Sequence, residues 1–428
     1  MKYKQIAFWI LLASLLLSGC SMMTIDQMYC LPKRSDSYNN LQTAIDTAML
    51  ELDYCAPVSG ENQQTVQIAD LDGDGALEYL IFAKGTQAQP LRILVFRNVD
   101  GDYIHIDTIK SNGTEFDRVE YVKMDNSRST LLVVGRKISD ELMRTLTVYT
   151  YSQQGIEQLM SVNYREFLPT DLNSDGLSEL FVLRSGMTET DNGIAEFYSL
   201  ENGEVKRSNE VNLSQPADNL KRILVGKLED SVPSVYAASA SEKTGIITDV
   251  FTIRDNLLAN ITSSGNTDIV SALNHYVYAN DIDSDGVLEL PEVLIQETSG
   301  RNSIRWYGVN QFGEKINKAY TYHNFVDGWY LLLDNEWANV VTVSSTGNRH
   351  DFYVFEEDCK TSQRILSIFK SDNQSWEGSG KGDIILQTTE ANTYTASLGE
   401  GAAAYGITKE FVLSGFYLIQ DEWNTEEM

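Results

Sequence analysis

The chain has 428 residues, with 33 basic and 61 acidic residues and a formal net charge of −28. A surface of this sign repels nucleic acid and anionic lipid, which excludes nucleic-acid binding as a function class and favours solubility or cationic partners. The length is sufficient for two or more domains with a substantial core.

The N-terminus is typical of an export signal. Lys2 and Lys4 precede an apolar run, Ile6 to Leu17, which is too short to span a bilayer. Residues 17–20 read Leu-Ser-Gly-Cys and resemble the lipobox of bacterial lipoproteins. This resemblance implies a signal peptide over 1–19, lipid attachment to Cys20, and an anchored location on the bacterial cell membrane, facing outside the cytoplasm. A plain secretory signal with a chance cysteine is the alternative.

Residues 20–60 predict an anchor linker and one packing helix that docks on the next domain. Apolar side chains recur at helical spacing from Leu41 to Leu52, and Asn39 or Asn40 can cap the helix. Three cysteines follow the lipobox: Cys30, Cys55 and Cys359. Spacing alone leaves open whether the first two are bridged, and the third is interpreted as a buried free thiol.

One nine-residue pattern occurs three times, at 70–78, 171–179 and 281–289. Each copy places side-chain oxygens at positions 1, 3, 5 and 9, a backbone carbonyl at position 7, and Gly at position 6. Ca²⁺ takes six to eight oxygen ligands, and Gly allows the sharp turn that points alternate side chains inward. The pattern therefore predicts about three structural calcium ions and not ordinary acidic turns. The expected ligands are Asp70, Asp72, Asp74, Ala76 and Glu78, then Asp171, Asn173, Asp175, Leu177 and Glu179, then Asp281, Asp283, Asp285, Val287 and Glu289.

An EF-hand is the nearest alternative, and it requires a carboxylate at position 12 between two helices. Position 12 is Ile81 in the first copy and Val182 in the second, both within strand-like apolar runs. Only the third copy has an acid there, Glu292, and it follows Pro291. The EF-hand interpretation therefore fails for two copies and is disfavoured for the third.

A second pattern, of alternating strands and short turns, predicts five hairpins at intervals of about fifty residues. Each hairpin has one aromatic anchor, in chain order Phe96, Tyr149, Tyr198, Phe251 and Tyr307. The calcium loops precede the first, third and fifth anchors, while 124–126 and 227–230 precede the others and lack the full ligand set. A repeat of this length predicts a mainly β fold, a β-propeller of about five blades over residues 61–322.

Over about 65–320 the repeat resembles the FG-GAP/VCBS type, in which a calcium loop lies between the strands of a blade. The resemblance implies that the acids named above are the calcium ligands. Asn173, which carries one charge fewer, and the two loops without ligands depart from that pattern. The whole chain also resembles uncharacterised VCBS-repeat lipoproteins of clostridial bacteria, which implies a compartment but no activity.

Residues 323–428 contain strand-like runs and one short predicted helix, from Ile407 to Phe416, with Thr408 as its cap. We expect a small α+β domain, and a sixth, degenerate blade over 328–369 is the alternative. Three tryptophans are candidates for a carbohydrate platform: Trp329, Trp337 and Trp376. Core packing is the favoured interpretation of these side chains.

No catalytic or cofactor-binding residues are predicted, so an enzyme is disfavoured. The four histidines lack zinc-type spacing, no Gly-x-Ser-x-Gly elbow occurs, and the glycine-rich segment 378–383 departs from a phosphate loop. The favoured function is a monomeric, lipid-anchored, calcium-stabilised surface module that binds an extracellular protein or glycan. A glycan hydrolase or lyase on a propeller scaffold and an envelope assembly lipoprotein are the alternatives.

Overall fold

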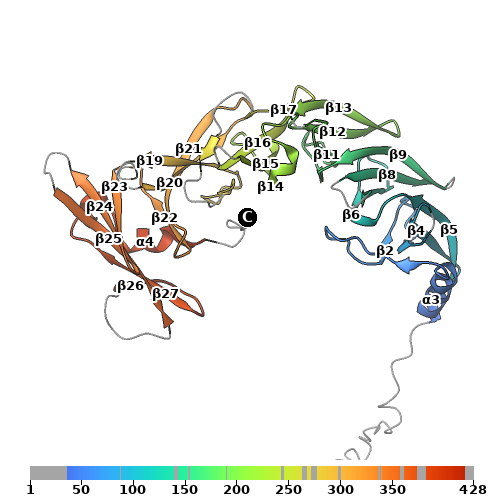
Figure 1. Cartoon of the computed structure of the whole chain (residues 1–428), viewed down its shortest axis with the longest axis horizontal. Coiled ribbons are helices and arrows are strands. Elements are labelled where there is room, and N and C mark those ends of the chain that lie inside the picture. The colour runs from blue at the N-terminus through green and yellow to red at the C-terminus, as the bar shows by residue number, and fades with distance from the viewer. Residues whose placement is uncertain are drawn as a thin grey trace, which may run out of the picture.

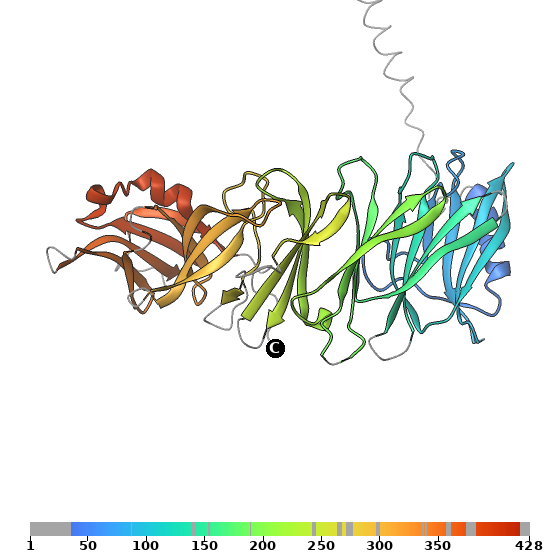
Figure 2. The same cartoon turned by 90° about the horizontal axis from the view of Figure 1, so that it is seen from above.

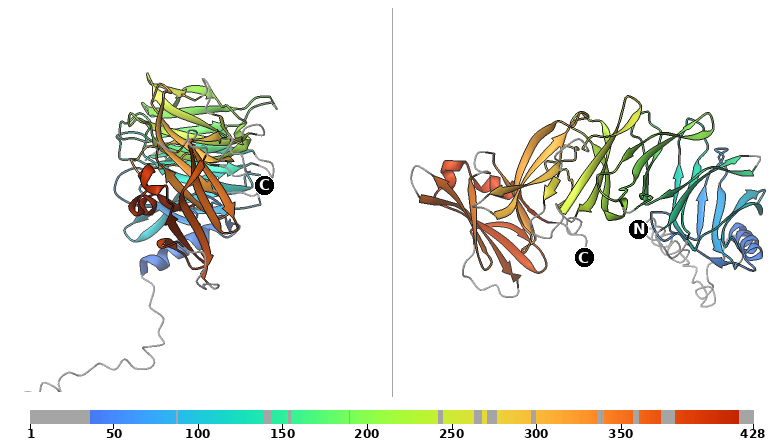
Figure 3. Two further views of the ribbon diagram at one scale, coloured as in Figure 1. Left: turned by 90° about the vertical axis from the view of Figure 1, so that its left-hand side faces the viewer. Right: turned by 45° about the horizontal axis from the view of Figure 1, so that its top comes forward.

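The computed structural model of the chain describes residues 36–419 except 87, 139–142, 153–154, 189, 242–244, 263–267, 271–276, 297–299, 336–337, 339, 357–360 and 374–381. This part of the chain is mainly β, with six antiparallel sheets in sequence order, named here the first to the sixth sheet. Figure 1 shows the sheets along an open arc, with the first and sixth sheets at its two ends. Figure 2 and the right-hand view of Figure 3 show the same single row from two other directions. Among the described strands none joins the first sheet to the sixth, so the arc does not close into a ring.

The first three sheets are meanders of neighbouring strands. The first sheet contains β1 (Asp53–Tyr54), β2 (Val66–Ala69), β3 (Glu78–Lys84), β4 (Leu91–Val99) and β5 (Asp102–Ser111), with β1 and β2 both paired to β3. The second contains β6 (Glu115–Val122), β7 (Leu131–Lys137), β8 (Arg144–Ser152) and β9 (Gly155–Tyr164). The third contains β10 (Glu166–Thr170), β11 (Glu179–Arg184), β12 (Ile194–Glu201) and β13 (Glu204–Asn212).

The last three sheets follow the same plan, with additions at their edges. The fourth contains β14 (Leu220–Lys227), β15 (Pro233–Ser241), β16 (Gly245–Arg254), β17 (Leu257–Asn260) and β18 (Asp268–Val270), and a short helical turn η1 (Ala217–Asn219) precedes it. The fifth contains β19 (Leu290–Gln296), β20 (Gly300–Val309), β21 (Lys315–Asn324), β22 (Trp329–Leu333) and the distant β28 (Phe416–Leu418). The sixth contains β23 (Val341–Thr346), β24 (Arg349–Glu356), β25 (Thr361–Asp372), β27 (Asn392–Leu398) and β26 (Ile384–Thr388), in that spatial order.

The five predicted hairpins are confirmed, and their aromatic anchors occupy equivalent places. Each anchor is buried on a central strand: β4, β8, β12, β16 or β20. A register shift adjoins the anchor in the first, second, third and fifth sheets. Two-residue hairpin turns of type I′ need positive φ at both central positions. Asp100 and Gly101 have φ of 54° and 97°, and Asn202 and Gly203 have 54° and 82°.

The core consists of layers between neighbouring sheets. Sheet faces pack on one another through aromatic pairs, each with ring centroids 5.1 or 5.2 Å apart. The pairs are Phe82–Phe116 between the first and second sheets, Tyr164–Phe167 between the second and third, Phe181–Phe251 between the third and fourth, and Tyr322–Phe352 between the fifth and sixth. Each sheet therefore depends on its sequence neighbours for burial, as in other repeat architectures.

The predicted packing helix is confirmed as α3 (Asp36–Ala48). Its apolar face lies on the first sheet, where the buried Ile45 packs with Ile81, Leu94 and Phe96. The helix begins before Asn39 and Asn40, so neither residue is its cap. Asn40 instead donates a hydrogen bond to the carbonyl of Gly101. In the part of the chain that the structure describes, no helix has the length and apolar character needed to cross a membrane.

The boundary expected between residues 322 and 323 falls inside β21, because this strand pairs with both β20 and β22. The fifth sheet thus continues to Leu333, and β28 joins its edge through Trp329 opposite Leu418. After β27 the chain forms η3 (Ala402–Tyr405), which contacts β25, and α4 (Lys409–Gly415), which contacts both β22 and β26. The predicted cap is confirmed, since the Thr408 hydroxyl accepts a hydrogen bond from the backbone N–H of Phe411.

Candidate calcium loops

The three acidic loops share one backbone conformation, and each leads into a strand. The first lies between β2 and β3, the second between β10 and β11, and the third before β19. Positions 4 and 6 both have positive φ in every copy: Gly73 and Gly75, Ser174 and Gly176, Ser284 and Gly286. This curvature brings alternate side chains to the inside of the turn. In the first loop position 4 must be Gly, because a Cβ on Gly73 would lie 2.3 Å from the carbonyl carbon of Arg128.

A common set of hydrogen bonds holds the carboxylates in each loop. The Asp at position 1 accepts from the N–H of the position-6 Gly at 3.1, 2.9 and 3.0 Å in the first, second and third loops. The Asp at position 5 accepts from the N–H at position 7 at 2.7, 2.8 and 2.9 Å. The Glu at position 9 accepts from the N–H at position 2 at 2.8, 3.4 and 2.9 Å. The Asp at position 1 also accepts at its other oxygen, from the backbone N–H of Gly73, Asp175 or Asp285, so backbone donors hold both of its oxygens.

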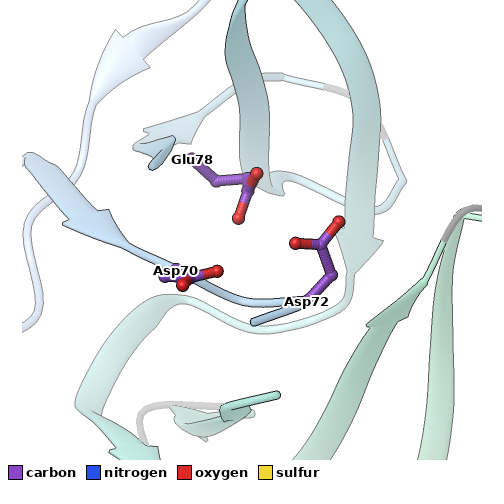
Figure 4. A group of neighbouring side chains, drawn as sticks. All are labelled: Asp70, Asp72 and Glu78. Carbon is purple, nitrogen blue, oxygen red and sulfur yellow. The ribbon is translucent and has the colours of Figure 1, made fainter. Parts of the chain in front are cut away.

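Carboxylates meet closely in two of the loops. Oxygen atoms of Asp70, Asp72 and Glu78 lie within 4.8 Å of one another, and so do those of Asp281, Asp283 and Asp285. Figure 4 shows the first group, with Glu78 and Asp72 directed toward the same space as Asp70. Three oxygen donors at this separation fit the ligand chemistry of a hard divalent cation.

The position-9 glutamates are the buried members of the loops, with Glu78, Glu179 and Glu289 exposed by 0, 3 and 0 %. Burial raises the pKa of both Glu179 and Glu289 to about 7. The hydrogen bond from the N–H at position 2 lowers these pKa values, and the neighbouring Asp carboxylates raise them further. Burial also raises the pKa of Glu78, against the Leu71 N–H and the Arg97 guanidinium. A cation among these carboxylates would favour their charged forms.

The second loop differs from the other two through its amide. Asn173 Nδ2 donates to Asp175 at 3.0 Å and to Glu179 Oε1 at 2.5 Å. The second of these bonds occupies Glu179 Oε1, the oxygen that the predicted calcium site would use as a ligand. Because this loop has one carboxylate fewer than the other two, we expect it to have the lowest affinity among the loops that bind a cation.

The EF-hand alternative is wrong for all three copies. Ile81 and Val182 are buried in β3 and β11, so the chain after these loops is strand and not helix. Glu292 lies on β19 and forms an ion pair with Arg305 of β20. The two segments without the full ligand set, 124–126 and 227–230, precede β7 and β15 as expected.

Two basic residues at the loops were not predicted. Arg97 of β4 contacts three acids of the first loop, Asp72, Asp74 and Glu78. Lys318 of β21 contacts Asp285 of the third loop at 2.7 Å and Glu229 at 3.1 Å. Both residues come from neighbouring strands, so their place depends on sheet register, for which the local sequence carries no signal.

A serine, a histidine and an aspartate also meet in the C-terminal part. Ser345 Oγ lies 2.8 Å from His350 Nδ1, and His350 Nε2 lies 2.6 Å from Asp327 Oδ2. Ser345 is exposed, while the imidazole is buried against the edge of Trp329. Ser345 and His350 are cross-strand partners on β23 and β24. Pairing of this hairpin brings Ser345 and His350 together, and the turn between β21 and β22 supplies Asp327, so the three residues form no sequence motif.

Several other predicted residues lie outside the described part of the chain: Cys20, Cys30, Cys359, Trp337 and Trp376. Trp329 is fully buried in the core around the fifth and sixth sheets, so it is not an exposed carbohydrate platform. Cys55 is a half-buried free thiol, and burial raises its pKa.

A groove of about 570 Å³ lies between α3 and the first sheet. Thr43 and Thr47 line it from the helix, and Tyr103 and His105 line it from β5. The Thr43 and Thr47 hydroxyls donate to the carbonyls of Asn39 and Thr43, so toward a polar ligand these two groups offer lone pairs that accept hydrogen bonds.

Comparisons with known proteins give distant structural similarity alone. No family model matches the chain, and no curated protein matches it in sequence. A crystal structure of a protein from Lactobacillus plantarum aligns over 72% of this chain and 85% of its own, with 9% identity and a TM-score of 0.29. The exotype rhamnogalacturonan lyase YesX aligns over 71% of this chain and 61% of its own, with 13% identity and a TM-score of 0.25.

Proposed function

We propose that this chain is a calcium-stabilised, lipid-anchored module of blade-like sheets that binds a protein or glycan outside the cytoplasm. The observation that carries the calcium part is the buried glutamate at position 9 of each loop. A buried carboxylate beside other carboxylates costs free energy unless a cation or a proton compensates it. A bound Ca²⁺ supplies that compensation and links the loop to the strand that follows.

The calcium proposal is tested by melting the full-length chain in detergent with chelator and with increasing calcium. We expect the melting temperature to rise with calcium over about 10⁻⁴–10⁻³ M, the range of extracellular sites. Magnesium should have a smaller effect, because it demands near-octahedral geometry and dehydrates reluctantly. An unchanged melting temperature in millimolar calcium, or a preference for zinc, would contradict the proposal.

The binding part rests on the groove between α3 and β5. Screening the protein against immobilised glycans and peptides identifies a ligand, and Thr47→Arg then tests the groove by filling it. Gln42→Arg is the matched control, since it adds the same charge to α3 outside the groove lining. Loss of binding in the first variant and its retention in the second supports the site. Equal binding by both variants places the ligand elsewhere.

Hydrolysis is the second candidate function, and the Ser345–His350–Asp327 contacts favour it. A nucleophile, a base and a group that orients the base within hydrogen-bond reach are the parts of acyl-transfer catalysis. Labelling with a fluorophosphonate that reacts with activated serines tests this candidate. We expect Ser345→Ala to lose the label and Ser344→Ala to keep it if the site is active. Absence of label in the unchanged protein would remove this candidate.

A further inference from the structure

The three loops differ in the residue opposite the buried glutamate. In the first loop Glu78 on β3 pairs directly with Arg97 on β4. Continuing the printed register by one residue places Ser199 opposite Glu179 and Gly308 opposite Glu289. A long cationic side chain therefore occurs at this place in the first loop, a short hydroxyl in the second, and no side chain in the third.

The guanidinium of Arg97 binds the oxygens that would otherwise face a cation. Its Nη2 lies 2.5 Å from Asp72 Oδ2 and 2.6 Å from Glu78 Oε1, and its Nε lies 2.8 Å from that same Glu78 oxygen. Glu78 Oε2 is already used by the backbone N–H of Leu71. Nη1 adds a longer contact of 3.5 Å to Asp74. One fixed cation thus reaches the acids at positions 3, 5 and 9.

The position of Arg97 is set by more than its carboxylate partners. Its backbone is fixed between β3 and β5 in the first sheet. Its guanidinium carbon lies 5.4 Å from the ring centroid of Tyr151 on β8, in the second sheet. The side chain is 22 % exposed. An arginine whose guanidinium already lies over an aromatic ring loses little further freedom when it binds carboxylates.

The third loop has a different arrangement. Lys318 contacts Asp285 at the exposed side of the loop and also contacts Glu229. Glu289 is fully buried, and one of its oxygens accepts from the N–H of Ile282. Within the described residues its other oxygen, Oε1, is buried without a hydrogen-bond partner. This oxygen belongs to the same loop as three carboxylates that meet within 4.8 Å.

We propose that Arg97 is the built-in cation of the first loop, so that this loop closes without a metal ion and the chain binds two calcium ions, not three. The inference deepens the calcium proposal above and rests on it for the number of ions. The first loop then stabilises the first sheet at any calcium concentration, whereas the second and third loops depend on calcium.

Counting bound calcium in the full-length chain tests the inference, with three variants beside the unchanged protein. We expect two ions in the unchanged protein, two in Arg97→Lys, which keeps a cation, and three in Arg97→Gln. Arg207→Gln is the matched control, because Arg207 forms its ion pairs with Glu196 and Glu210 outside all three loops. We expect two ions in that control. Three ions in both the unchanged protein and Arg97→Gln would overturn the inference.

Melting in excess chelator separates failure of the inference from failure of the calcium proposal. Arg97→Gln is expected to melt below the unchanged protein there, and added calcium should recover the loss. If no variant binds calcium, the calcium proposal fails, and the chelator comparison still decides the role of Arg97. An Arg97→Gln variant that melts like the unchanged protein in chelator would overturn the built-in cation. If Arg97→Gln does not fold, the ion count of the unchanged protein decides between two and three.

Discussion

The Tyr236 hydroxyl lies 3.1 Å from the backbone carbonyl oxygen of Leu288, so the fourth sheet is hydrogen-bonded to the third acidic loop. Tyr236 is buried on β15, and the same hydroxyl lies 3.3 Å from the carbonyl oxygen of Lys227. Leu288 is position 8 of the loop, next to the buried Glu289. The tyrosine therefore links two neighbouring units at the place where the loop leads into the strand.

Tyr236→Phe should lower the free energy of unfolding by about 1 kcal/mol, the net contribution of an ordinary hydrogen bond. A carbonyl left without its donor in a buried site raises the loss toward about 3 kcal/mol. Urea unfolding of Tyr236→Phe and of the unchanged protein measures this loss of unfolding free energy. Tyr54→Phe is the control, since Tyr54 is 49 % exposed. Equal losses in the two variants would show that the link between the sheets contributes nothing specific.

Asp72→Ala and Asp283→Ala should respond differently to calcium, because they lie in loops with and without the built-in arginine. Asp283→Ala is expected to remove up to about 2.7 kcal/mol of calcium-dependent stabilisation at a hundredfold excess over Kd, and to differ little in chelator. Asp72→Ala should lower the melting temperature by the same amount with and without calcium. Melting both variants in each buffer distinguishes these outcomes, and an identical calcium response in the two would contradict unequal loops.

Local features were predictable from the sequence. The turn geometry of the three loops was predictable because the spacing of the acids and the glycine is encoded within nine residues. The hairpins were found because residues such as Asp100-Gly101 and Asn202-Gly203 adopt positive φ readily. The packing helix followed from its apolar face, of which Ile45 is the buried centre.

Features that depend on long-range pairing were not predictable. Arg97 reaches the first loop only because β3 and β4 pair with Glu78 opposite it. The expected domain boundary placed β22 and β28 outside the fifth sheet, whereas pairing of Trp329 with Leu418 joins these segments, which lie far apart in the chain. The loop pattern predicted cation binding but held no information on which of its carboxylates an arginine contacts.

Cys20→Ala should release the chain from the membrane fraction or leave it unprocessed, because lipid attachment at that thiol is the expected anchor. Labelled palmitate incorporated during growth, followed by fractionation, measures the effect. Cys55→Ala is the control, since Cys55 is a free thiol in the folded chain. Equal incorporation by the Cys20 variant and the unchanged protein would rule out the lipobox interpretation.

The buried His323 should make the protein sensitive to mild acid. Complete burial lowers the pKa of its imidazole to about 3, compared with about 6.5 in an unfolded chain. Between these values the unfolded state binds the additional proton, so the free energy of unfolding falls as the pH falls below about 6.5. At pH 5 this group alone costs about 2 kcal/mol relative to pH 7.

His323→Phe tests this dependence with a ring of similar shape that does not titrate. The His323 ring stacks on Tyr330, with an interplanar angle of 12° and centroids 5.1 Å apart, and a phenyl ring can keep that contact. The variant loses the hydrogen bond with Thr321 at both pH values, so this loss cancels when its stability at pH 7 and pH 5 is compared. Urea unfolding in calcium-free buffer should show a drop between pH 7 and pH 5 that is about 2 kcal/mol smaller in the variant than in the unchanged protein. The loop carboxylates titrate alike in both proteins, so they do not affect this comparison. An equal fall in unfolding free energy in the two proteins would mean that His323 binds its proton in the folded state.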